Sequence, residues 1–214
     1  MTEAFEQFFD NFRWMGWNLF LAIIPYALSF ILFDKRFAKR SPKQLPQNLI
    51  WWFGIAIFIL FLPNAPYILT DIIHFVYDTR LPDISTNGVI FVLIPQYFTF
   101  ILLGYQLYVL SMMNLIHYLS LIKLVKNTTW VEIVINFICA IGVYWGRVNR
   151  LNSWYVLTQP RRVIQDAVNN LESPNFFLGT FIFFVVFTGL YYIFKWINLA
   201  IAFYWNNRFS SLSR

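Results

Sequence analysis

The chain has 214 residues and a formal net charge of +6; 59% of its residues are hydrophobic, 21% are aromatic and only 12% are charged. A soluble domain carries about 25% charged residues, so these polar side chains are too few to cover a surface in water. The single cysteine excludes a disulfide-stabilised secreted domain. We therefore expect one integral membrane domain over residues 1–214. It should be an all-α, polytopic bundle of about five transmembrane helices with short interfacial amphipathic helices.

Positive charge is concentrated directly after the first apolar segment. Membrane proteins place Lys and Arg in cytoplasmic loops, so this clustering indicates a lipid bilayer and no nucleic-acid partner. Other membrane protein subunits are a further expected class of partner, because apolar helices with short loops suit lateral association. The cations in question are Lys35, Arg36, Lys39, Arg40 and Lys43.

The first segment combines an amphipathic start with an uncharged stretch. Phenylalanines recur at helical spacing from Phe5 to Phe12, with polar residues between them, which predicts a short helix lying on the bilayer surface. Residues 14–33 contain no charge and are the first expected span. Pro25 is expected to kink this span.

The second expected span covers residues 49–70. Pro63 and Pro66 lie near its end, and two prolines so close together predict a break or bend in the helix. The helix is expected to resume beyond them and to continue as far as Asp78.

The third expected span covers residues 89–111, followed by an interfacial continuation to residue 126. An alternative splits the long apolar stretch into two spans, which would give six in total. Within this stretch only Gly104 offers a turn, and no polar loop separates the two halves. We therefore favour a single span.

The last two spans are expected at residues 129–147 and 175–197. Thr129 and Glu132 match a capping box at the start of the former, which explains Glu132 better than a proton relay does. An amphipathic helix is expected to begin at Pro160, and residues 198–205 are expected to lie along the membrane surface.

With five spans, most Lys and Arg residues fall on the inner side if the N-terminus is outside and the C-terminus is cytoplasmic. The membrane would be a bacterial-type cytoplasmic membrane or a comparable internal membrane. Four arginines then lie outside, where a site or an ion-pair network would hold them; the six-span alternative would instead move them inside. These are Arg147, Arg150, Arg161 and Arg162.

The end of the second span carries the first candidate motif. Asp71, His74 and Asp78 are spaced so that one helix face presents all three, next to the motif residues Asn64 and Tyr67. Asp71 and Asp78 are about 10 Å apart along the helix axis, too far to share one ion, so we expect no metal site.

The second motif follows the fourth span and contains Arg147, Arg150 and Asn152. One interpretation is that Asp71 and Asp78 neutralise the two arginines and fix the second span to the fourth. The other is that the arginines bind an anionic lipid headgroup or phosphate, with Asp71 and His74 available for proton transfer. We favour the structural interpretation.

Gly142 and Gly146 form a Gly-x-x-x-Gly spacing that permits close helix packing. The nucleotide-binding glycine motifs and the metalloprotease motif are absent from the sequence, and His117 is too far from His74 to share a haem with it. We expect no cofactor.

The two motifs together resemble a bacterial multi-pass membrane family catalogued as domain of unknown function number thirteen sixty-one. The resemblance covers roughly the first to the fifth span. It supports the membrane topology and the choice of site residues, and it implies no chemistry, because the family has no assigned reaction. The family pattern often has an acid after Asn-Ser-Trp, where this chain has Tyr155. The resemblance rests on Asn64-Ala65-Pro66-Tyr67, Thr70-Asp71, His74 and Gly146 to Trp154.

These observations favour a non-enzymatic membrane protein that binds a ligand, assists assembly or serves as a subunit of a complex. An enzyme or carrier acting on an anionic lipid or lipid-linked phosphate is the second hypothesis, and a small-solute or proton-coupled transporter is the third. The candidate polar cluster, expected at the outer surface, consists of Asn64, Tyr67, Asp71, His74, Asp78, Arg147, Arg150 and Asn152.

Overall fold

A computed structural model describes residues 1–34, 45–46, 48–171 and 173–212 of the chain. Over these residues the chain is helical and contains no strand, which confirms the all-α prediction. The cations of the basic loop, residues 35–43, lie outside the described part. Five helical stretches are long and apolar enough to cross a membrane: Thr2–Leu32, Leu49–Asp78, Thr86–Leu121, Thr128–Val148 and Pro174–Arg208.

The first helix, α1, runs without interruption over Thr2–Leu32. The expected division into a surface helix and a span was therefore wrong, and Pro25 lies buried inside the continuous helix. The physical reason is packing at the N-terminal end. Ala4 is fully buried, and a Cβ atom added to Gly88 would lie 2.7 Å from the Cβ of Ala4. This close contact with the third span holds the first turn of α1 against the bundle.

The second span is interrupted where its prolines predicted. Helix α3 (Leu49–Phe61) ends before Pro63, and three short helical pieces follow: α4 (Asn64–Tyr67), the 3₁₀ helix η1 (Ile68–Asp71) and α5 (Ile72–Asp78). Each proline lacks the backbone N–H that would continue the helical ladder, so the backbone adjusts over one to two turns before regular helix resumes.

The third span is a single unit. It begins with α6 (Thr86–Gly88) and the π-helix η2 (Val89–Leu93), and continues as α7 (Ile94–Leu121). Gly104 is buried inside α7, where an added Cβ would lie 2.4 Å from Cδ1 of Ile68. Gly104 therefore permits close packing of η1 and marks no turn. Residues 112–121, expected as an interfacial continuation, extend the same helix.

The fourth span, α8 (Thr128–Val148), begins with a different cap from the one expected. The side chain of Asn127 accepts a hydrogen bond from the backbone N–H of Thr129 at 2.9 Å. Glu132 is buried, pairs with Lys195 and accepts a hydrogen bond from the Tyr191 hydroxyl at 3.0 Å. The capping-box interpretation was wrong, because Asn127 caps the helix and leaves Glu132 free to pair with another helix.

The C-terminal part contains α9 (Tyr155–Thr158), α10 (Pro160–Leu171) and α11 (Pro174–Leu212). Helix α10 begins at Pro160, as predicted. Residues 198–205 continue α11 and form no separate surface segment. The Asn198 side chain exchanges hydrogen bonds with Gln106 of α7, which fixes this part of α11 to the bundle.

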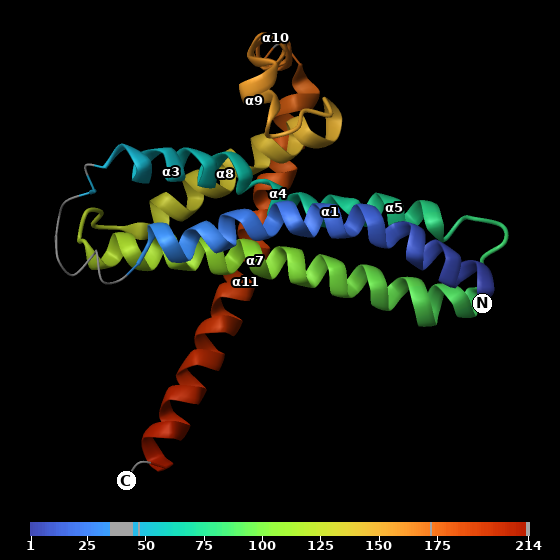
Figure 1. Ribbon diagram of the computed structural model, residues 1–214, viewed down its shortest axis with the longest axis horizontal. Coiled ribbons are helices and arrows are strands. Elements are labelled where there is room, and N and C mark those ends of the chain that lie inside the picture. The colour runs from blue at the N-terminus through green and yellow to red at the C-terminus, as the bar shows by residue number, and fades with distance from the viewer. Residues whose placement is uncertain (35–44, 47, 172, 213–214) are drawn as a thin grey trace.

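Figure 1 shows α1 and α7 lying side by side along the length of the molecule, with α4 and α5 beside them, while α11 crosses them steeply and its C-terminal end projects away. Helix α8 packs mainly on α11 and also contacts α4. The contact between α4 and α8 brings the two motifs together.

Candidate functional site

Two glycines of α8 allow the proline-containing break to pack directly against it. An added Cβ on Gly142 would lie 2.8 Å from Cγ of Pro63, and one on Gly146 would lie 3.2 Å from the ring of Tyr67. Pro63 and Tyr67 are four residues apart, as are the two glycines, so each contact lies one helical turn from the other. The Gly-x-x-x-Gly spacing thus serves close packing, as predicted, and its partner is the interrupted helix.

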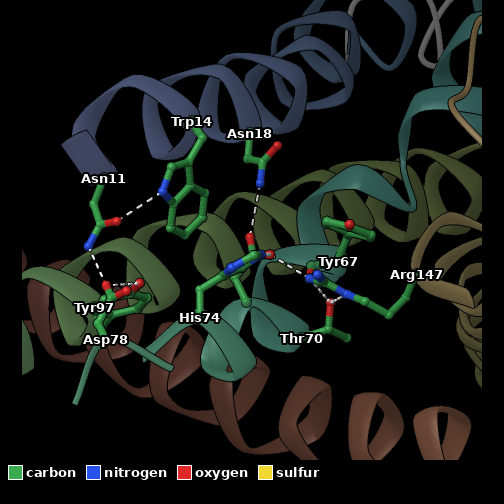
Figure 2. Close-up of polar contacts among 10 residues, drawn as sticks. Asn11, Trp14, Asn18, Tyr67, Thr70, His74, Asp78, Tyr97 and Arg147 are labelled. Carbon is green, nitrogen blue, oxygen red and sulfur yellow. Dashed lines mark hydrogen bonds and ion pairs between the residues drawn. The ribbon is translucent and has the colours of Figure 1, made fainter. Parts of the chain in front are cut away.

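Asp71 and Arg147 form an ion pair at this contact, as the structural interpretation expected. The Asp71 side chain is 1% exposed and that of Arg147 is 17% exposed, so both charges are largely removed from solvent. Arg147 also donates from Nε to Oγ1 of Thr70 at 2.8 Å, and its guanidinium lies 4.3 Å from the centre of the Tyr67 ring. Four interactions of one side chain therefore join the end of α8 to α4 and η1 (Figure 2).

The second oxygen of Asp71 accepts a hydrogen bond from Nδ2 of Asn18 at 3.0 Å, so α1 also takes part in this cluster. His74 lies beside Asp71, with its Nε2 4.0 Å from Oδ1, the oxygen that Arg147 also contacts, and with its side chain 50% exposed. The His74 ring packs against Trp14 at a centroid distance of 4.9 Å (Figure 2). Asp71 is thus surrounded on several sides, and an external molecule has little access to it.

Asp78 belongs to a separate cluster, and the expectation that it neutralises an arginine was wrong. Its side chain is buried and accepts hydrogen bonds from Nδ2 of Asn11 at 2.6 Å, the hydroxyl of Tyr97 at 2.8 Å and Nε2 of Gln7 at 3.2 Å. Asp78 lies about 10 Å beyond Asp71 along the helix axis. At this position the side chain of Asp78 is closer to α1 and α7 than to α8. Neutral donors from these two helices stabilise the carboxylate (Figure 2).

Arg150 does not join Arg147. It is exposed, its backbone has a φ of 54°, and its side chain makes no hydrogen bond or ion pair within the described part of the chain. The turn that begins there lets the backbone N–H of Leu151 bond to the carbonyl of Trp145 at 3.1 Å and directs the following residues back toward α4.

The remaining motif residues surround a polar cavity of about 120 Å³. Asn64 donates to Oγ of Ser153 at 3.0 Å and to the carbonyl of Phe61 at 2.8 Å, which connects the two motifs across the cavity wall. The side chains of Tyr67 and Asn152 line the cavity and make no hydrogen bond with the described residues. The complete lining is Trp17, Asn18, Leu21, Pro63, Asn64, Tyr67, Gly142, Gly146, Leu151, Asn152 and Ser153.

The expected cluster of eight residues is therefore divided into parts. Asp71 and Arg147 form the ion pair, with His74 beside Asp71, while Asn64, Tyr67 and Asn152 line the cavity. Asp78 belongs to a separate cluster, and Arg150 is exposed next to the cavity residue Leu151. Over the residues that the structure describes, no group of three or more His, Cys, Asp and Glu side chains could hold a metal ion.

Sequence reasoning missed Asn11 and Asn18 of α1 and the buried ion pair of Glu132 with Lys195. The two asparagines are seven residues apart on one face of an otherwise apolar helix, and this spacing was the available signal. Glu132 and Lys195 each lie close to one end of a predicted span, so their positions alone did not indicate that they meet.

No curated protein matches the chain, and no solved structure matches it. A family model described as a protein of unknown function, DUF1361, matches residues 17–190, which include both motifs and the whole of the cavity. The chain, with its five candidate membrane spans, therefore belongs to the DUF1361 family, in agreement with the resemblance found in its sequence.

Proposed function

We propose that this protein is a membrane-embedded binding protein and that the polar cavity between α1, α4 and α8 is its ligand site. The observation that carries the proposal is the cavity itself, about 120 Å³ in volume and lined by residues of both motifs. Tyr67 and Asn152 present polar side-chain groups that the described residues leave without hydrogen bonds. A small number of precisely placed polar groups is what fixes the orientation of a small molecule in its site.

In this proposal the Asp71–Arg147 ion pair holds the walls of the cavity in place and does not contact the ligand. Asp71 is nearly inaccessible, and neither member of the pair lines the cavity. Arg147 is neutralised by Asp71, so its charge is largely unavailable to an external phosphate. His74 does not line the cavity either. These facts support binding over the alternative of an enzyme in which Arg147 holds phosphate and Asp71 with His74 transfers protons.

We further propose that the cavity faces the outer side of a bacterial-type cytoplasmic or internal membrane, with the N-terminus outside and the C-terminus cytoplasmic. The distribution of Lys and Arg residues supports this orientation. Membrane lipids surround the protein in this proposal, and other membrane protein subunits are further candidate partners.

The proposal is tested by filling the cavity. Asn152 is exposed enough to accept a larger side chain, so Asn152→Phe should block the cavity without unfolding the protein. Asn175→Phe is the matched control, because Asn175 is exposed at the start of α11 and does not line the cavity. Each protein is extracted from its native membrane into an amphipathic polymer, and bound small molecules are identified by mass spectrometry.

We expect a molecule that is retained at fixed stoichiometry by the wild type and by Asn175→Phe and is lost from Asn152→Phe. Circular dichroism establishes that all three proteins are folded. Equal retention by the two folded variants, or no retained molecule in any sample, would overturn the proposal.

A further inference from the structure

We infer that the ligand is an amphiphile with an uncharged, hydroxyl-rich head group, such as a sugar or polyol, and a hydrocarbon chain lying between α3 and α8. This inference rests on the proposed binding function and specifies the class of ligand. Two adjoining cavities of opposite character carry it.

The polar cavity favours a neutral head group because no charged side chain lines it. Its hydrogen-bonding residues carry amide or hydroxyl groups, and these can both donate and accept, as sugar hydroxyls do. The indole ring of Trp17, which is 53% exposed, adds a flat aromatic surface to this lining. A phosphate would instead require a cation directed into the cavity. Arg147 is paired with Asp71, and Arg150 is exposed and is not among the lining residues.

A larger, apolar groove of about 370 Å³ adjoins the polar cavity. The two share five lining residues: Pro63, Gly142, Leu151, Asn152 and Ser153. Beyond this shared wall the groove is lined by Ile59 and Leu60 of α3, by Ile138, Ile141 and Trp145 of α8, and by Val156 and Val163. One continuous path therefore leads from amide and hydroxyl groups to hydrocarbon side chains, as an amphiphile requires.

The groove extends along α8 toward the middle of the span. Ile138 precedes Gly146 by eight residues, which corresponds to about 12 Å of helix. Ile59, Ile138 and Val156 are each more than 40% exposed on the outer surface of the bundle. A hydrocarbon chain can therefore enter the groove sideways from the bilayer while its head group enters the polar cavity.

The test compares probes that share one chain. The protein is placed in phosphatidylcholine nanodiscs and titrated with decyl glucoside, decyl phosphate or glucose below the concentrations that disrupt the discs. Native mass spectrometry counts the probe molecules bound. We expect decyl glucoside to bind at one per chain and at least tenfold more tightly than decyl phosphate, and glucose alone to bind more weakly still.

Variants test each half of the site. Val156→Trp should fill the groove and abolish decyl glucoside binding, whereas Val134→Trp is the matched control, at an exposed position of α8 outside the groove. Asn152→Ala should weaken binding about three- to tenfold through the loss of one hydrogen bond. Asn175→Ala should leave binding unchanged.

The outcomes separate this inference from the proposed function. Tighter binding of decyl phosphate, or equal binding by Val156→Trp and Val134→Trp, would overturn the inference. A second outcome is that no probe binds, while wild-type protein from native membranes retains a different molecule that Asn152→Phe loses. This outcome would overturn the inference and support the binding function. Failure of every probe with nothing recovered would overturn both.

Discussion

The ion pair between Asp71 and Arg147 should stabilise the fold measurably, and removing both members should cost less than the sum of the two single removals. Asp71→Asn leaves the Arg147 guanidinium largely buried with Thr70 and the Tyr67 ring as its remaining partners. Breaking a buried pair costs about 3–5 kcal/mol. We expect about 3 kcal/mol, the lower end, because the Arg147 side chain is 17% exposed and retains some contact with water.

The assay is reversible unfolding in mixed micelles of dodecyl sulfate and a mild detergent, followed by circular dichroism. Asp71→Asn, Arg147→Met and the double variant form a cycle. The double variant should be more stable than the sum of the single effects predicts, by about 1 kcal/mol or more, because no unpaired charge remains. Asp83→Asn is the control for the loss of one carboxylate, since Asp83 is exposed.

Additive effects within about 0.5 kcal/mol would refute this reasoning, because independent sites add to that precision. The same conclusion would follow if Asp71→Asn changed the free energy of unfolding no more than Asp83→Asn. In either case the contact between the two motifs would not depend on their charges.

In the same unfolding assay, Gly142→Ala should lower the free energy of unfolding by about 1–3 kcal/mol, because its Cβ would lie 2.8 Å from a proline ring. Gly189→Ala, with open space around it, should not lower the free energy of unfolding. Equal effects of the two substitutions would contradict the close packing of α4 on α8. Glu132→Gln should cost about 2–3 kcal/mol, since it leaves the lysine of α11 without its buried partner; an unchanged free energy of unfolding would show that the pair contributes nothing. The variants Arg80→Cys and Arg161→Cys should both react with a membrane-impermeant maleimide added from outside, because two spans separate the two positions. Labelling of the two variants from opposite sides would reject the five-span arrangement.

The helices were predicted correctly where interactions within one segment of the chain determine its structure. Apolar runs long enough to cross a bilayer form helices because each backbone group must be satisfied within its own segment. The interruption at Pro63 and Pro66 follows from two missing N–H groups, and the start of α10 at Pro160 follows from the preference of proline for the first helical turn. None of these features requires knowledge of a neighbouring helix.

The ends of the helices were less predictable because packing decides them. The first turn of α1 remains helical through its contact with Gly88, and α11 continues past residue 197 where Asn198 meets Gln106. A hydrophobicity pattern locates where a helix enters the membrane, but it contains no information about which side chains support the helix beyond that point.

The amino-acid sequence alone determined that this protein is a helical membrane protein and where its second span breaks. It predicted that Asp71 meets Arg147, but it placed Asp78 and Arg150 in the same cluster. Tertiary structure decided the remaining partners: Asp78 meets Asn11 and Tyr97, and Glu132 meets Lys195. The physical reason is that an ion pair or hydrogen bond between helices depends on how each helix is rotated and how closely two backbones approach. Contacts between residues far apart in the chain set the rotation and the approach of the helices. One such contact, between two glycines of α8 and the proline break, also encloses the polar cavity.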